Sequence, residues 1–420
     1  MLGSMWGVRP YLSQHGITLS VQETSEVLGN VSGGMHKGFD YDGLTTAGLQ
    51  LDTQRAFGWN GGTFNVSALQ IHGRNLSADN LGSLQTASGI EAERNTRLWE
   101  LWYEQQFLDE HRFDIKVGQQ SIDQEFMVSD NALLFVNTMF GWPMVPSVDM
   151  PAGGPAYPLA ALGVRAKALL NDSVKFLAGV FNGSPANKAG VNNSGTGFPM
   201  DGGLLAIAEV QYSYPSLGTM VSPTSTTPLP GTYRLGMWYD TENFADQHID
   251  NTGLSLADPS SSGNARMRHG NYSFYAVADQ MVWHSEELES RSLNFFTRIM
   301  GTPQTDRNLV DFSLNVGFTL HQPFASREND TFGMGVGYAD VSHSAAGLDR
   351  DTAAFNPGTY TPIRSGETFI EATYKYQVTP WFQVQPDFQY VFNPGAGAAD
   401  GNGNRIRNEA VIGIRTNITF

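Results

Sequence analysis

The chain has 420 residues and a net charge of −16, only 16% of its residues are charged, and it contains no cysteine. The absence of cysteine excludes disulfides, thiolate metal sites and cysteine nucleophiles. The acidic balance argues against nucleic acid as a partner, because that needs clustered lysine and arginine, and against a basic helix on a membrane surface.

The N-terminal segment 1–15 differs from the rest of the chain. It lacks the basic and apolar regions of a secretory signal peptide. Either the protein is cytosolic or such a signal has already been removed, and Gly3 and Ser4 suggest an engineered end. We therefore expect the signal peptide to be absent from this chain.

From residue 99 to the last residue, successive segments alternate between apolar and polar residues. In 233–240 the odd-numbered residues are tyrosine, leucine and methionine, and the even-numbered ones include arginine, glycine and aspartate. This period of two predicts β-strands with one apolar face. In 99–107 it places Trp99 and Leu101 on the apolar face, opposite Glu100. The predicted strands lie at 99–107, 113–118, 162–168, 233–240, 313–320, 332–338, 367–378, 381–392 and 407–420.

The connections between these strands differ in length. The tight ones are 170–173 and 378–380, and the long ones are 73–93, 143–158, 182–203, 242–270 and 342–365. Strands of about ten residues with short turns on one side and long loops on the other are typical of a transmembrane antiparallel β-barrel. We expect one domain, 1–420, with short periplasmic turns and long extracellular loops.

The polar faces of the predicted strands favour a barrel in lipid. They consist mostly of glycine, asparagine, glutamine, threonine and serine with sparse charges, which suits a water-filled lumen. A closed barrel also leaves no unpaired strand edge in hydrocarbon. A soluble sandwich or β-helix shares the alternation, and this alternative stays open at this point.

The segment 131–164 is the most apolar stretch, with Asp149 as its single charge. Five prolines interrupt it, so it cannot be a membrane-spanning helix. We predict a strand followed by a long loop. Residues 143–158 are rich in proline and glycine, and we expect them to fold inward as a constriction, where irregular backbone is lined by water.

Two features of the strands call for local explanations. Pro386 lies in the middle of a strand, where it cannot donate a ladder hydrogen bond, so we expect a bulge or a local distortion. Gly333, Gly335 and Gly337 fall on one strand face. No helix pattern follows them, so we interpret them as lumen space or close backbone approach rather than as a nucleotide-binding loop.

The sequence carries no catalytic motif that we can identify, and we predict that the protein is not an enzyme and has no cofactor. Asp40, Asp42 and Gly43 match part of a calcium loop but lack the trailing glutamate, so turn chemistry is the preferred interpretation. The nine histidines are scattered singly, and we assign no metal site.

Nine stretches, in order along the chain, make it resemble the carbohydrate-selective porin family (OprB type) of Gram-negative outer membranes. The resemblance implies a 16-stranded barrel, passive uptake of sugars and export to the outer membrane. It also implies that the terminal aromatic residue, Phe420, serves as a signal for the barrel insertion machinery. The stretches are EVLGNVSGG (26–34), RLWELWYEQ (97–105), FVNTMFGWP (135–143), PAGGPAYPLAALGVR (151–165), VFNGSPA (180–186), PGTYRLGMWYDT (230–241), YAVADQMVW (275–283), PQTDRNLVDF (303–312) and AVIGIRTNITF (410–420).

The polar strand faces supply the residue types that bind sugars. Carboxylates and guanidinium groups bond vicinal hydroxyls, and aromatic rings stack on C–H faces. An aromatic residue between two carboxylates, as in Glu100, Trp102 and Glu104, is the clearest such group, although charged lumen residues can instead pair across strands and brace the wall. The candidates for the substrate pathway are Glu100, Trp102, Glu104, Asp114, Lys116, Arg165, Lys167, Arg234, Trp238, Asp240, Arg298, Glu371, Lys375 and Arg415.

These expectations amount to an outer-membrane porin for facilitated diffusion of monosaccharides such as glucose. Its partners would be carbohydrates, outer-membrane lipid and the insertion machinery, and it would be a monomer or a trimer. A general or ion-selective diffusion porin is the alternative. A polysaccharide hydrolase is disfavoured, because Glu100 and Glu104 would lie about 13 Å apart along a strand, too far for a catalytic pair.

Overall fold

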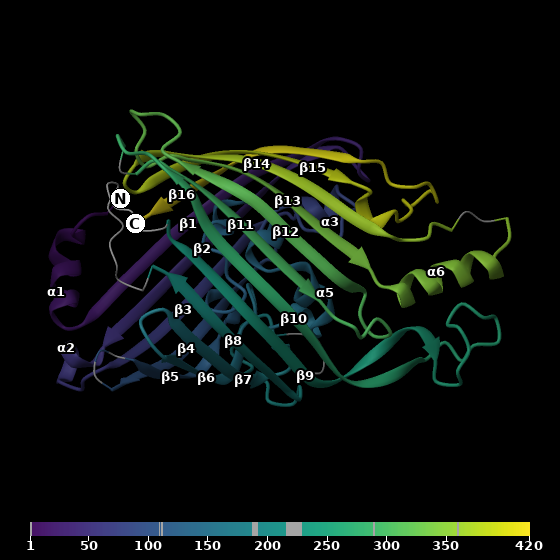
Figure 1. The fold of residues 1–420 in the computed structure, drawn as a ribbon, viewed down its shortest axis with the longest axis horizontal. Coiled ribbons are helices and arrows are strands. Elements are labelled where there is room, and N and C mark those ends of the chain that lie inside the picture. The colour runs from purple at the N-terminus through teal and green to yellow at the C-terminus, as the bar shows by residue number, and fades with distance from the viewer. Residues whose placement is uncertain are drawn as a thin grey trace.

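The computed structural model describes residues 2–108, 110, 112–186, 192–215, 229–288, 290–358 and 361–420. Sixteen antiparallel strands follow one another around a closed barrel, and the last strand pairs with the first (Figure 1). The predicted 16-stranded barrel is thereby confirmed. The strands are β1 (Ile17–Ser32), β2 (Gly38–Asp52), β3 (Gly62–Gly73), β4 (Asn95–Phe107), β5 (Phe113–Gln120), β6 (Ala161–Leu169), β7 (Val174–Asn182), β8 (Leu204–Tyr214), β9 (Gly231–Asp250), β10 (Ala265–His284), β11 (Ser292–Gly301), β12 (Val310–His321), β13 (Thr331–Val341), β14 (Gly366–Thr379), β15 (Phe382–Phe392) and β16 (Glu409–Thr419).

Alternation along each strand sorts side chains between the two faces of the wall. On β9, Leu235 is 67% exposed on the outer face, whereas Trp238 and Asp240 are fully buried on the inner face. Successive residues of a strand point to opposite faces, so the apolar residues form the exterior of the barrel. Among the described residues, no helix is both long enough and apolar enough to cross a membrane.

The two ends of the barrel differ. Both termini lie at one end, which we call the terminus end, together with α1 (Val8–Gln14) and α2 (Thr53–Phe57); α6 (His343–Phe355) stands beyond the opposite end (Figure 1). Turns 170–173 and 380–381 connect strands at the terminus end, and connections 121–160 and 342–365 leave the opposite end. β8 ends and β9 begins at the terminus end, and the chain between Tyr214 and Gly231 is longer than those turns, so length alone does not separate the ends.

The prediction that residues 242–270 form a loop is wrong. β9 and β10 pair as far as Asp250 and Ala265, so only 251–264 connect them. In this extension Asp246 pairs with Arg268 (2.8 Å). Polar residues on the extended hairpin weaken the alternation of apolar and polar residues that marks strands in the wall. The polarity that suggested a loop therefore belongs to a hairpin that extends past the rest of the wall (Figure 1).

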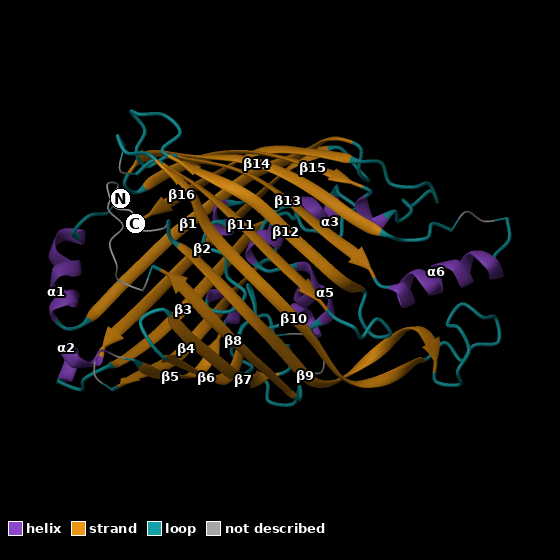
Figure 2. Cartoon of the chain, in the orientation of Figure 1, coloured by secondary structure: helices purple, strands orange, loops and turns teal. Residues whose placement is uncertain are grey.

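Two connections fold back into the barrel. We call residues 76–93 the first inward segment and residues 121–160 the second inward segment; both contact side chains on the inner face of the wall. They contain short helices, several of which lie within the outline of the barrel (Figure 2). These are α3 (Leu76–Asp79), η3 (Ile122–Gln124), η4 (Ala132–Leu134), α4 (Thr138–Gly141), α5 (Met144–Asp149) and η5 (Pro151–Gly153), and outside the inward segments lie η1 (Met5–Gly7) and η6 (Pro394–Ala396).

The strand predicted at the start of 131–164 is therefore wrong. These residues form helical turns, and the Asn137 side chain accepts a hydrogen bond from the Met139 N–H at the start of α4. The apolar side chains of this segment pack with Phe296 and Phe369 in the main buried cluster. Because most of its apolar side chains are buried against the inner face of the wall, the segment is apolar without the period of a strand.

The local features of β13 and β15 have simple causes. Pro386 pairs with Ile414 in an unbroken register, so the predicted bulge is absent. On its other side, β15 has no partner on β14 for Gln385 and Pro386, so the ladder is locally interrupted.

On β13, a Cβ on Gly335 would lie 2.6 Å from Cζ of Phe140 in the second inward segment. The glycines of β13 thus allow close approach, as predicted.

Candidate functional site

The lumen is the candidate site, and its shape depends on how the second inward segment is attached to the wall. The Arg298 guanidinium, on β11, donates hydrogen bonds to the carbonyl oxygens of Met127 (2.9 Å), Phe140 (3.1 Å) and Gly141 (3.1 Å). Arg298 is almost completely buried. One wall cation therefore bonds carbonyl oxygens at the end of α4, where unsatisfied carbonyls carry partial negative charge.

Wall carboxylates hold the backbone N–H groups of the same segment. Glu371 accepts hydrogen bonds from the N–H groups of Val136 (2.6 Å) and Asn137 (3.0 Å). Asp279 accepts one from the Ser129 hydroxyl (2.7 Å). Each wall carboxylate thus satisfies donors that an irregular segment cannot pair internally, which fixes the segment against β10 and β14.

The first inward segment is attached in the same way. Glu367, on β14, accepts hydrogen bonds from the N–H groups of Leu84 and Gln85, both at 2.8 Å. The Ser88 hydroxyl donates to Glu26 on β1 at 2.5 Å. The two segments also contact each other, because the Thr138 hydroxyl donates to the Ser88 carbonyl (2.7 Å). The lumen is consequently narrowed by two connected segments.

Six predicted pathway residues come together on β4, β5 and β6. Arg165 pairs with Asp114 and with Glu104 (2.8 Å), and Lys167 pairs with Asp114 (2.9 Å). The Lys116 ammonium lies over the Trp102 ring, 4.4 Å from its centroid. We call Trp102, Glu104, Asp114, Lys116, Glu125, Arg165 and Lys167 the charged cluster.

Glu125 completes the charged cluster from the second inward segment, and no periodic pattern marks this residue in the sequence. It pairs with Lys116 and with Arg165 (2.6 Å). Burial alone would raise the pKa of Glu125, but the charges of Lys116 and Arg165 hold this pKa below its usual value. Glu125 is therefore ionised and joins the segment to the wall electrostatically.

The other predicted residues lie elsewhere on the inner wall. Glu100 accepts a hydrogen bond from the Ser121 N–H (3.1 Å), and Arg234 pairs with Asp279 (2.8 Å) and Asp130 (2.9 Å). Arg415 pairs with Glu26. Trp238, Asp240 and Arg298 are buried beneath other side chains.

Trp99 was predicted on the outer face, and that prediction is wrong. The pairing of β3 with β4 changes register between Leu98 and Leu101, which turns Trp99 inward. Its ring packs edge-on against Tyr157 of the second inward segment, with centroids 6.4 Å apart. A bulge places consecutive residues on one face, and alternation cannot reveal it.

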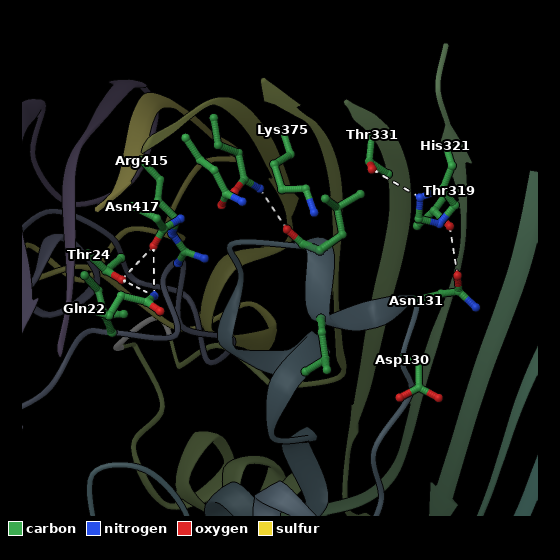
Figure 3. Close-up of a pocket in the computed structure, with 15 residues that line it drawn as sticks. Gln22, Thr24, Asp130, Asn131, Thr319, His321, Thr331, Lys375, Arg415 and Asn417 are labelled. Carbon is green, nitrogen blue, oxygen red and sulfur yellow. Dashed lines mark hydrogen bonds between the residues drawn. The ribbon is translucent and has the colours of Figure 1, made fainter. Parts of the chain in front are cut away.

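Two cavities open on the lumen at the terminus end. The first, the terminus-side cavity, has a volume of about 390 Å³ and is lined by residues of β1, β12, β13, β14, β15 and β16 and by Asp130, Asn131, Leu133 and Leu134 of the second inward segment (Figure 3). The second has about 300 Å³ and is lined by part of the charged cluster. Asp130 borders both cavities, and no periodic pattern marks it in the sequence.

Known proteins share both the sequence pattern and the fold. The sequence model of the carbohydrate-selective porin family, OprB, matches residues 36–420. The chain is 26% identical to Porin B of Pseudomonas aeruginosa over 444 residues, covering 100% of the chain and 91% of that protein. It is 23% identical to the putative porin QuiX of Acinetobacter baylyi over 417 residues, covering 94% of the chain and 88% of that protein.

Among solved structures, the high-pH structure of Pseudomonas putida OprB superposes with a TM-score of 0.86 at 24% identity, covering 100% of the chain and 98% of that structure. This likeness concerns the fold, and the family match concerns almost the whole sequence. The chain therefore belongs to the OprB family of carbohydrate-selective porins, and it is a sugar-selective porin of the outer membrane.

Proposed function

We propose that this porin conducts monosaccharides such as glucose by facilitated diffusion. The observation that carries the proposal is the attachment of the second inward segment to the wall by Arg298 and Glu371. A segment held from both sides narrows the lumen to a fixed cross-section, which admits a single sugar ring more readily than a linked pair. Useful flux needs weak binding, on the order of millimolar or about −4 kcal/mol, because tighter binding slows exit.

The proposed constriction is larger than the loop 143–158. The wall contacts of Arg298, Asp279 and Glu371 fall between residues 127 and 141, and the proline-rich part follows. We therefore assign the narrowing to the second inward segment as a whole, together with the first. The irregular backbone of both segments lies within the barrel, where it faces water and protein rather than lipid.

Within the charged cluster, the residues divide by exposure. Arg165 and Asp114 have side chains only 2% exposed and brace the wall. Glu104, Glu125 and Lys167 border the second cavity and retain surface toward it. We assign these three to transient contacts with sugar hydroxyls, because carboxylates accept and ammonium groups donate hydrogen bonds.

Single-channel recording in planar bilayers tests the proposal. Glucose at tens of millimolar is expected to reduce the ion current reversibly, and a disaccharide is expected to enter liposomes much more slowly than glucose. Free passage of salt with no effect of glucose would favour the rival, a general or ion-selective diffusion porin. Equal swelling rates for glucose and the disaccharide would also contradict the proposal.

We also propose that Phe420 is an assembly signal. Its N–H donates to the Val21 carbonyl (3.0 Å), which places the residue at the seam between the first and last strands. Replacing Phe420 with serine is expected to reduce the amount of barrel in the outer membrane several-fold without altering the unit conductance of the channels that form. Normal insertion of the variant would contradict the assignment. The molar mass of the protein in detergent distinguishes an assembly of one barrel from an assembly of three.

A further inference from the structure

We propose that the terminus-side cavity is a binding site for an anionic sugar, a polyhydroxylated compound that carries a carboxylate. The inference rests on the proposed function, since it adds a second class of solute to the same lumen. It concerns a cavity that is separate from the charged cluster and shares only Asp130 with the second cavity.

The first observation is a wall cation without a counter-ion. Lys375, on β14, lines the cavity between Arg415 and His321 (Figure 3). Among the residues that the structure describes, no carboxylate lies within ion-pair distance of its ammonium group. Arg415, which also lines this cavity, pairs with Glu26, and Arg234, which lines the second cavity, pairs with Asp279 and Asp130. The Lys375 ammonium is thus available to a solute carboxylate.

The second observation is the composition of the remaining surface. Amide and hydroxyl groups from five strands line the cavity, and amides offer both donors and acceptors to a polyol. Leu133, in η4, is 62% exposed within the lumen, which is unusual for an apolar side chain facing water. It supplies the apolar surface against which the C–H face of a sugar packs. The amide and hydroxyl groups belong to Gln22, Thr24, Thr319, Thr331, Gln383, Gln385 and Asn417.

Size and charge agree with such a ligand. The volume of about 390 Å³ falls at the lower end of the roughly 300–1,000 Å³ range of small-molecule sites. The groups facing the cavity that carry full charges are Lys375, Arg415 and Asp130, and Asp130 is paired with Arg234. The cavity is therefore locally cationic in a chain whose net charge is −16. The net negative charge of the whole protein repels an anionic sugar, so the attraction must come from the local charge of this cavity.

Block of the single-channel current by gluconate tests the proposal, with glucose as the neutral reference. Recording in about 0.1 M salt keeps the screening length near 10 Å, so that the contribution of one charge is measurable. The variant is Lys375→Met, which keeps an unbranched side chain one atom shorter than lysine and removes its charge. The matched control is Lys175→Met, since Lys175 lines the second cavity instead. Acetate and inorganic phosphate serve as anions without a sugar skeleton.

Gluconate is expected to block the wild-type channel at millimolar concentration. Lys375→Met is expected to raise the ratio of the half-blocking concentrations of gluconate and glucose by about tenfold, the loss of one charge-assisted hydrogen bond. Lys175→Met is expected to leave this ratio within about twofold. An unchanged ratio in Lys375→Met, or an equal change in both variants, overturns the proposal. Equal block by acetate or phosphate overturns its sugar component.

The same titrations separate this proposal from the proposed function. If glucose fails to block while gluconate blocks in a manner that depends on Lys375, the preference for neutral monosaccharides fails and the anionic site stands. If glucose blocks and the gluconate effect does not depend on Lys375, the anionic site fails and the monosaccharide function stands.

Discussion

Replacing residues 122–159 with a short glycine-rich turn is expected to raise the single-channel conductance about threefold or more, because current through a water-filled pore is limited by its narrowest cross-section. The replacement is geometrically simple. β5 and β6 are neighbours, and Gln120 pairs with Ala161, so the two strand ends are already adjacent. The wall itself keeps all sixteen strands.

The same variant is expected to lose discrimination between monosaccharides and disaccharides in liposome swelling. Glu371, Asp279 and Arg298 lose their partners in the segment, but water that fills the widened lumen hydrates them, so the barrel still forms at reduced stability. Removal of α6 is the matched control, since α6 stands beyond the opposite end of the barrel (Figure 1). Unchanged conductance after excision of 122–159, or an equal increase after loss of α6, would show that the second inward segment does not set the pore size.

The wall could be predicted from the sequence because its two environments differ sharply. Lipid outside and water inside impose a polarity that changes with every residue, so segments such as 233–240 and 332–338 carry a strong period of two. The last strand and its pairing with the first follow from closure. A change of register, as beside Trp99, escapes this reasoning, and so does the polar extension of β9 and β10 that was predicted as a loop.

The interior could not be predicted to the same extent. Most apolar residues of the second inward segment pack against protein rather than lipid, so they carry no period of two, and the wall partners Glu371 and Arg298 lie more than a hundred residues away in sequence. The sequence pattern did identify the charged residues that face the inside of the barrel. Whether Arg298 binds carbonyls, Arg165 braces carboxylates or Lys375 faces an open cavity depends on that segment and on the strand stagger. The alternation of apolar and polar residues reveals neither the path of that segment nor the stagger of the strands.

Replacing Arg165 with methionine is expected to destabilise the barrel by about 3 kcal/mol, the lower end of the cost of removing one partner from a buried ion pair. The Arg165 side chain is 2% exposed and is paired with Asp114, Glu104 and Glu125. Lys116 and Lys167 remain to compensate in part. The measurement is the denaturant midpoint of unfolding in detergent micelles.

The control for this substitution is Arg112→Met. Arg112 also pairs with two carboxylates, Glu110 (3.0 Å) and Asp172 (2.7 Å), but its side chain is 36% exposed at a turn. Exposed ion pairs contribute little to stability, so this variant should unfold close to the wild type. A second test adds Asp114→Asn to Arg165→Met; two carboxylates, Glu104 and Glu125, then face two lysines, Lys116 and Lys167, so part of the lost stability should be recovered.

Acid should distinguish the charged cluster from simple packing. The pKa of Glu125 is held below its usual value of 4.5, so its ion pairs stabilise the folded state fully above pH 4.5 and are lost as the pH falls through the lower, folded pKa. The wild type should therefore lose stability on acidification below about pH 4.5, and Arg165→Met should lose less, because one of the charges that lower this pKa is gone. Parallel acid profiles for the two proteins, together with equal denaturant midpoints for Arg165→Met and Arg112→Met, would mean that Arg165 acts only as a space-filling side chain.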